Sequence, residues 1–164
     1  MGHSFFKVAL RKLQPCTRAF STAPIAKREA SGRPYSDLIV GCPRETYPGE
    51  RRTAITPQNA ALLLKKGFRQ VLIASGSGTQ ASFPDEAYTA VGASIVQQED
   101  VLARSDILLK VRPPQLALDA STELTHMKQD ATLISFVFPA VNKELVRSMQ
   151  DKRLTLFGMD CIPR

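Results

Sequence analysis

The sequence predicts an α/β fold in which helices cover both faces of a mostly parallel sheet with about six strands. Two observations lead to this prediction. Short runs rich in Val, Ile and Leu recur along the chain from residue 37, and helix-like segments alternate with them. Glycine, proline and small polar residues mark the boundaries, as expected where strands end and helices begin. Such strand–helix alternation is typical of flavodoxin-like and Rossmann-like lobes.

The first half of this pattern carries clear helix signals between its apolar strands. Thr56 is a good N-cap residue, Pro57 suits the first helical position, and Gly67 follows two lysines at the expected carboxyl end. Pro84 precedes two acids, which favour the first turn of the next helix. The expected elements, in order, are strand 37–42, helix 56–67, strand 70–75, helix 84–92 and strand 93–97.

The second half continues the alternation with shorter signals. The runs DILLKV, TLISFVF and LTLFGMD are rich in branched and aromatic residues and are predicted to be strands. The segments between them contain the Leu, Glu, Lys and Met residues that favour helices. The expected elements are helix 100–105, strand 106–111, helix 124–128, strand 132–138, helix 142–152 and strand 154–160.

Charge divides the chain into a leader at 1–28, a polar linker at 29–36 and a folded lobe at 37–164. The leader contains six Lys or Arg residues and no acid, which leaves 16 basic against 15 acidic residues in the remainder. An acid-free amphipathic leader with Ser and Arg is typical of a mitochondrial transit peptide, and a disordered basic tail is the alternative. Because the lobe is nearly neutral, we expect no nucleic-acid partner.

Three cysteines, Cys16, Cys42 and Cys161, show neither CxxC spacing nor a histidine at metal-ligand spacing. We therefore expect free thiols and no metal site. The apolar stretch ATLISFVFPAV is shorter than the roughly 18 residues that indicate a membrane span.

A glycine-rich stretch at 76–81, GSGTQA, follows a predicted strand and matches the relaxed dinucleotide-binding pattern G-x-G-x-x-A. That site requires a long helix to begin at the second glycine, so that its amino terminus faces the pyrophosphate. Pro84 instead indicates that a new helix begins several residues later. We interpret 76–81 as a structural turn.

The connection at 41–57, GCPRETYPGERRTAITP, is unusually charged for a strand-to-helix loop. Either it is a solvated loop, or it lies at the site that α/β proteins build where strands end. Arg44 is expected to pair with Glu45, and Glu50 with Arg51 or Arg52, whereas Lys110 is interpreted as a charge at a strand end.

Five stretches together resemble one family. GCPRETYPGERRTAITP, KKGFRQVLIASGSGTQASFPDEAYTAVGASIV, ILLKVRPP, TLISFVFPAVNKELV and LTLFGMDCIPR are similar in order and spacing to the N-terminal lobe of proton-translocating NAD(P) transhydrogenases and alanine dehydrogenases. Arg52 and Arg112 match positions that hold the substrate carboxylate in the dehydrogenases. Pro139 stands where those enzymes have a histidine, and SFVFPA and MDCIPR look like the transhydrogenase branch.

The resemblance implies part of the NAD(H)-binding component of a transhydrogenase, which exchanges hydride with NADP(H) on a sister component while protons cross a membrane component. It implies a homodimer on the matrix side of the mitochondrial inner membrane. Arg164 matches a family arginine that contacts the cofactor, and Arg52 and Arg112 are cleft-lining candidates. Because the chain stops at Arg164, before the glycine-rich nucleotide lobe, we expect a truncated form that is inactive alone. An alanine dehydrogenase-like lobe and a non-enzymatic dimerisation or regulatory module remain alternatives.

Overall fold

The computed structural model describes residues 32–115 and 123–163. The predicted leader, Cys16 and Arg164 lie outside these residues. No helix in the two described ranges is long and apolar enough to cross a membrane.

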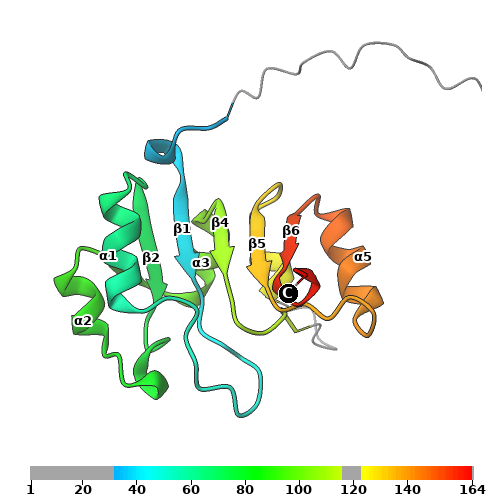
Figure 1. Cartoon of the computed structure of the whole chain (residues 1–164), viewed down its shortest axis with the longest axis horizontal. Helices are drawn as coiled ribbons and strands as arrows, with labels where there is room; N and C mark the ends of the chain where they lie inside the picture. The colour runs from blue at the N-terminus through cyan, green and yellow to red at the C-terminus, as the bar shows by residue number, and fades with distance from the viewer. Residues whose placement is uncertain (1–31, 116–122, 164) are drawn as a thin grey trace, which may run out of the picture. The chain divides into compact units, whose positions relative to one another are not determined.

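Six strands form one parallel sheet, as the sequence predicts (Figure 1). The strand order is β3-β2-β1-β4-β5-β6, so the chain builds outwards from β1 in one direction and then from β4 in the other. The strands are β1 (Ile39–Cys42), β2 (Gln70–Ala74), β3 (Ser94–Val96), β4 (Ile107–Leu109), β5 (Thr132–Ser135) and β6 (Thr155–Gly158).

Helices cover both faces of the sheet. They are α1 (Pro57–Lys65), α2 (Asp85–Ala90), α3 (Gln98–Arg104), α4 (Glu123–His126) and α5 (Lys143–Asp151). The predicted cap of α1 is confirmed, because the N–H of Asn59 donates to the Thr56 hydroxyl at 3.3 Å and Pro57 occupies the first turn. Short 3-10 turns lie at Tyr35–Asp37, Thr79–Ala81 and Met159–Cys161.

Alternate residues of each strand enter two separate cores. On one face, α1 and α2 pack on Val71 and Ile73 of β2, and Tyr88 is fully buried there with its hydroxyl donating to the Ile55 carbonyl at 2.7 Å. On the other face, α3, α4 and α5 pack around Leu72, Leu108 and Leu133. This in-and-out alternation follows from the two-residue period of a strand.

Gly41 lets α3 approach β1 closely. A Cβ atom at this position would collide with the side chain of Ser105 and lie 2.9 Å from a methyl group of Val101. The absence of a side chain at Gly41 therefore sets the distance between β1 and the α3 layer.

Asp106 joins the segment before β1 to the lobe at the amino-terminal edge of the sheet. Its carboxylate accepts the N–H of Ile39 at 3.0 Å, the Lys128 ammonium at 2.6 Å and the Arg33 guanidinium at 3.2 Å. Burial opposes ionisation, but these donors outweigh it and lower the pKa of Asp106. Tyr35 stacks on Phe68 with ring centroids 4.8 Å apart. Residues from Arg33 onward, assigned to the linker by sequence, thus contact the lobe.

Candidate functional site

The candidate site lies at the carboxyl edge of the sheet, above the junction of β1 and β4. The chain leaves β1 towards β2 on one side, while β4 pairs with β1 on the other. Such a topological switch point opens a crevice beyond the strand ends, where α/β proteins bind ligands. The loop after β1 supplies Glu45 and Glu50, and the loop after β4 supplies Arg112.

Glu50 brings the two predicted arginines together. Its carboxylate accepts two hydrogen bonds from Arg52, at 2.7 and 2.6 Å, and one from Nε of Arg112 at 2.9 Å. From the sequence, either Arg51 or Arg52 was expected to pair with Glu50. In the structure Arg52 is the partner, and Arg112 is a second one. Hydrogen bonds from Arg52, reinforced by Arg112, lower the pKa of Glu50 to about 2 against the opposing effect of burial. The triad therefore carries one net positive charge.

The two guanidinium groups lie beside exposed aromatic rings. Arg52 and Arg112 line a cavity of about 210 Å³ together with Val111, Phe136 and Phe138. The guanidinium carbon of Arg112 also lies 4.9 Å from the ring centre of Tyr47, within the range of a cation–π contact. Both cleft-lining candidates thus line one cavity, whose cationic and aromatic groups suit a flat, polar or anionic ligand.

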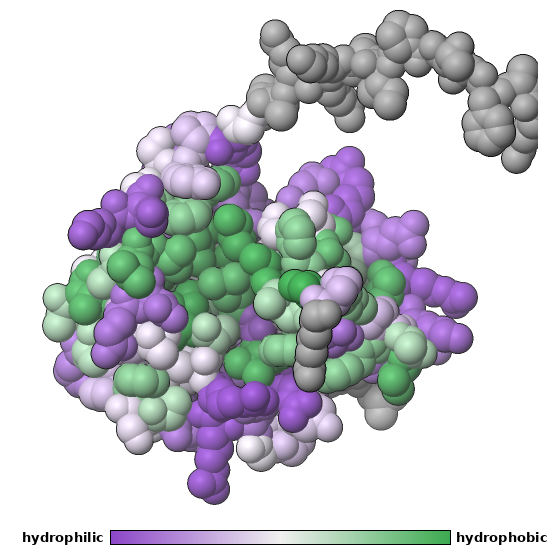
Figure 2. Space-filling model, viewed as in Figure 1, coloured by the Kyte–Doolittle hydropathy of each residue, from purple (hydrophilic) through white to green (hydrophobic). Residues whose placement is uncertain are grey.

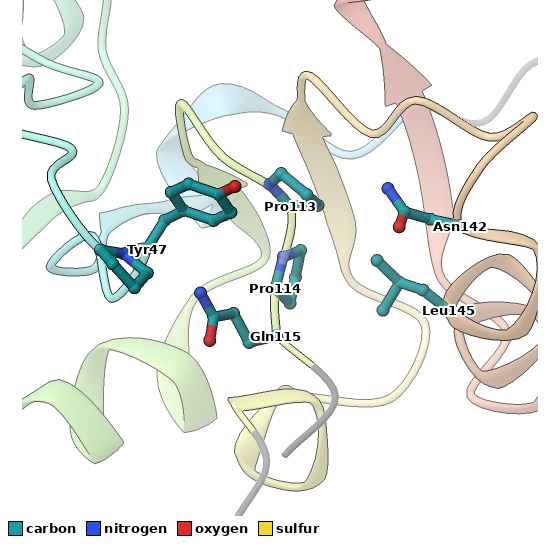
Figure 3. A pocket seen from close by; sticks show the side chains of 7 residues that line it. Tyr47, Pro113, Pro114, Gln115, Asn142 and Leu145 are labelled. Carbon is teal, nitrogen blue, oxygen red and sulfur yellow. The ribbon is translucent and has the colours of Figure 1, made fainter.

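A larger hollow of about 610 Å³ lies next to this one, between the loops after β1 and β4 and the start of α5 (Figure 3). Tyr47, Pro113 and Pro114 form one side, and Asn142 and Leu145 form the other. Prolines fix the backbone on the first side, because their φ angle is locked. No charged side chain is among the described residues that line this hollow, whose wall mixes polar and apolar groups.

Lys110 is the centre of a buried polar cluster beneath the crevice. Its side chain is fully buried, and its ammonium lies 3.0 Å from Oε1 of Glu123 and 3.7 Å from Oε2 of Glu45. Oε1 of Glu123 also accepts from Thr46 at 3.2 Å and from Gln98 at 3.4 Å. Oε2 of Glu123 is buried without a hydrogen-bond partner among the described residues.

Sequence analysis missed this cluster. Lys110 does lie at a strand end, directly after β4, but its burial was not expected, and Glu45 was paired with Arg44, whereas it lies against Lys110. The signal was a lone lysine within the apolar run ILLKV, since a lysine next to a buried parallel strand can itself be buried and must then be paired. The acidic partner on α4 could not be identified, because it is thirteen residues away and the sequence does not fix how α4 packs.

Carboxylates close three strand ends by accepting backbone N–H groups. Glu45 accepts the N–H of Val111 at 2.6 Å and of Arg112 at 3.2 Å. Asp160 accepts the N–H of Val137 at 2.8 Å and of Phe138 at 3.1 Å, and these bonds, that of Val137 above all, lower its pKa. The second pair holds Phe138 at a φ of 51°, an unusual angle for a bulky residue.

The glycine-rich turn is closed in the same way. Both carboxylate oxygens of Asp85 accept the N–H of Gly76, at 3.0 and 3.1 Å, and one accepts the Ser75 hydroxyl at 2.9 Å. A 3-10 turn at Thr79–Ala81 follows, and α2 begins only at Asp85 after Pro84. The interpretation of 76–81 as a structural turn is therefore confirmed, since the donor that a phosphate would need at Gly76 is already bound to a carboxylate.

No histidine is found among the described residues that line the two cavities of the site. The two histidines of the chain are His3, in the leader, and His126, which is exposed at the end of α4. Pro139 directly follows Phe138 beside the arginine-lined cavity. Among the described residues, the arrangement can bind and orient a ligand through guanidinium and aromatic groups, and no histidine lines it.

Comparisons with known proteins agree with this fold. Residues 41–164 match the family described as alanine dehydrogenase/PNT, N-terminal domain. The chain is 40% identical over 128 residues to NAD(P) transhydrogenase subunit alpha of Cereibacter sphaeroides, an alignment that covers 77% of this chain and 23% of that protein.

Two solved structures also share the fold. A transhydrogenase from Sinorhizobium meliloti has a TM-score of 0.69 and 31% identity, over 77% of this chain and 34% of that one. An L-alanine dehydrogenase has a TM-score of 0.68 and 27% identity, over 74% and 32%. The chain thus spans a quarter to a third of the length of these proteins.

Proposed function

The chain belongs to the alanine dehydrogenase/PNT N-terminal domain family, and on this premise we propose that it is the N-terminal lobe of the NAD(H)-binding component of a proton-translocating transhydrogenase. The observation that carries the proposal is the 40% identity to a protein named NAD(P) transhydrogenase subunit alpha. Hydride transfer between two nicotinamides needs positioning and electrostatics rather than a nucleophile or a metal. A site of guanidinium and aromatic groups without an imidazole suits that task.

In this proposal, the crevice at the carboxyl edge forms one wall of the cofactor cleft. Arg164 contacts the nicotinamide end of NAD(H), while Arg52 and Arg112 line the facing wall. Glu50 already satisfies hydrogen-bond donors of both arginines, so a small carboxylate substrate has to compete with it. This competition, with Pro139 in the place of a histidine, favours the transhydrogenase role over the dehydrogenase role.

The lobe by itself is proposed to bind NAD(H) weakly and to be inactive. Pyrophosphate recognition needs free backbone N–H groups at a helix amino terminus. Here the N–H groups after β2, β4 and β5 are bound to Asp85, Glu45 and Asp160. Tight NAD(H) binding therefore requires a further lobe, and proton-coupled transfer requires the NADP(H)-binding and membrane components. We place this assembly, as a homodimer, on the matrix side of the mitochondrial inner membrane.

A chimera tests the proposed activity. Residues 37–164 replace the matching segment of the Cereibacter sphaeroides subunit alpha, and membranes that contain the chimera are assayed for hydride transfer between NADH and NADP analogues. We expect activity within about tenfold of the parent, because a lobe of the same fold should preserve the relative position of the two nicotinamides. Complete loss of activity in a chimera that still assembles in the membrane would overturn the proposal.

The alanine dehydrogenase alternative rests on the structural likeness to an L-alanine dehydrogenase and on the paired arginines. To test this alternative, residues 37–164 replace the matching segment of the L-alanine dehydrogenase. The chimera is then assayed for NADH oxidation that depends on pyruvate and ammonia. We expect no activity with Pro139 in place, since no imidazole is then available for proton transfer. An active chimera would favour the dehydrogenase role.

If the lobe is a non-enzymatic module, the native protein should differ in size and in location from a transhydrogenase. An antibody raised against residues 37–164 should detect, in mitochondrial membrane fractions, a band several times larger than 18.0 kDa if the lobe is part of a transhydrogenase. A single soluble band near 18.0 kDa would favour the dimerisation or regulatory module instead.

A further inference from the structure

The ion pair between Lys110 and Glu123 is poorly explained by stability. The Lys110 side chain is fully buried directly after β4, and Oε2 of Glu123 is buried without a hydrogen-bond partner among the described residues. A buried ion pair repays its desolvation only when its remaining donors and acceptors are also bonded, and apolar side chains of similar volume often give an equal or greater free energy of unfolding. The incompletely bonded pair is better explained by a role in geometry.

The cluster around Lys110 joins segments that meet at the carboxyl edge of the sheet. Glu45 comes from the loop after β1, and Glu123 begins α4. At the start of α3, Gln98 donates to Glu123 at 3.4 Å and accepts the backbone N–H of Arg44 at 2.8 Å. Figure 2 shows hydrophilic surface at this edge, at the bottom of the view, where Figure 1 places the loop after β1. The loop is therefore bonded on its inner side, while its outer side faces solvent.

Glu45 connects this cluster to Arg112. Its carboxylate lies 3.7 Å from the Lys110 ammonium and accepts the backbone N–H of Val111 at 2.6 Å and of Arg112 at 3.2 Å. The Glu45 side chain is 4% exposed, and an ionised carboxylate buried to this extent is costly without a cation beside it. Lys110 therefore allows Glu45 to remain in the position from which it binds the backbone at Arg112.

A turn in the same loop holds the side chain of Arg112. Residues 47–50 read Tyr-Pro-Gly-Glu, the N–H of Glu50 donates to the Tyr47 carbonyl at 3.1 Å, and Gly49 has a φ of 80°. Proline and glycine at the two central positions are typical of a type II turn. The turn brings the Tyr47 ring centre to 4.9 Å from the guanidinium carbon of Arg112, and the Glu50 carboxylate to 2.9 Å from its Nε. One loop thus holds both the backbone and the side chain of Arg112.

We propose that Lys110 is a positioning residue for Arg112. Its ammonium keeps the Glu45 carboxylate buried, and Glu45 fixes the backbone of Arg112. The cavity that Arg52 and Arg112 line is therefore formed before a ligand enters. Preorganisation of this kind reduces the ordering that a ligand has to impose when it binds. That NAD(H) is the ligand rests on the proposed function, whereas the role of Lys110 rests on the contacts alone.

Hydrogen exchange of the full 164-residue chain, followed by NMR, tests this role. Lys110→Met combined with Glu123→Leu replaces the ion pair by apolar side chains. We expect the amides of Val111 and Arg112 to exchange at least tenfold faster than in the natural chain, relative to the amides of β2 as an internal reference. The Nε–H of Arg112, which is bonded to Glu50, should also exchange faster. Circular dichroism checks that the variant is folded.

Two further variants separate positioning from stability. Glu45→Gln offers the two N–H groups a single acceptor oxygen, so the amide of Val111 or of Arg112 should exchange at least tenfold faster. This variant carries the test if the double variant does not fold. Met149→Ala is the control, because Met149 is buried near the end of α5, which leads back to the start of β6. It weakens the core but should leave the exchange of Val111 and Arg112, relative to β2, unchanged.

Three results would overturn the proposal. They are exchange at Val111 and Arg112 within twofold of the natural chain in the double variant or in Glu45→Gln, an unchanged Nε–H of Arg112 in the double variant, and equal acceleration in Met149→Ala. These measurements use neither a nucleotide nor hydride transfer. Their failure would leave the result of the chimera unaffected, and an inactive chimera would not contradict the role of Lys110.

Discussion

Among single residues, Lys110 has the environment least expected for its type. Its ammonium is fully buried between Glu123 and Glu45. Lys110→Ala leaves two carboxylates without a cation, and removal of one partner from a buried pair costs about 3–5 kcal/mol of the free energy of unfolding. Urea denaturation measures this loss. Arg153→Gln is the control, because the Arg153–Asp130 pair is exposed on both sides and should contribute about 0–1 kcal/mol. Similar losses for the two variants would contradict the role given to Lys110.

The lowered pKa of Glu50 predicts how the free energy of unfolding depends on pH in acid. Its folded pKa of about 2 lies below the unfolded value of 4.5, so ionised Glu50 stabilises the fold fully above pH 4.5. That contribution is lost as the pH falls from 4.5 towards 2. The difference in unfolding free energy between the natural chain and Glu50→Gln should therefore be constant near neutral pH and shrink below pH 4.5. Denaturant titrations across this range measure it, and a difference that does not change with pH would refute the ion-pair assignment.

The sequence indicated which residues of the crevice were unusual but not how they are connected. Charge density identified the loop with Glu50 and Arg52, and the family resemblance added Arg112. That Glu50 bonds to both arginines depends on two loops separated by 62 positions. Such a contact is fixed by strand order, which alternation of strands and helices does not specify. The placement of Arg52 and Arg112 was therefore predictable only as candidates, and their shared partner was not.

At the level of the elements, the packing of α3 on β1 depends on Gly41. Gly41→Ala places a methyl group against Ser105 and Val101, and overpacking of this kind costs about 1–3 kcal/mol. Ser105→Gly in the same chain should recover part of the loss, which a double-mutant cycle measures by denaturation. Gly32→Ala is the control, because a methyl group there has no neighbour within 4 Å. Additive losses for Gly41→Ala and Ser105→Gly would show that the two side chains do not compete for space.

The predicted strands were correct in order and type, but several were too long. Strand 132–138 ends as β5 at Ser135, because Asp160 takes the N–H groups of Val137 and Phe138 and turns the chain. Strand 154–160 ends as β6 at Gly158, where a 3-10 turn begins. Both strands end where Asp160, just after β6, contacts the segment just after β5. This contact ends the strands although the apolar runs of the sequence continue past their last residues. Local signals such as the Thr56 cap gave the start of α1 correctly, because they act within a few residues.

For the whole molecule, the sequence predicts a targeting segment at residues 1–28 and a folded lobe from residue 37. Among the described residues, those of both cores lie between Ile39 and Leu156. Residues 1–28 fused to a reporter should carry it into mitochondria, as the acid-free amphipathic pattern predicts. Fluorescence microscopy and import assays measure this. A variant with Arg11 and Arg18 changed to Glu is the control and should stay in the cytosol. Equal import of both would contradict the transit-peptide prediction.

The strand order also has a consequence for how fast the chain folds. Within each half of the sheet, β1 to β3 and β4 to β6, the strands that pair are separated by a single crossover. The two halves meet where β1 pairs with β4, through Val40–Ile107 and Gly41–Leu108, and the residues of each of these pairs are 67 positions apart. Closing a long segment before its contacts form slows folding. The β1–β4 pairing should therefore be the late step, and the two halves, β1 to β3 and β4 to β6, should gain structure before the crevice between them exists.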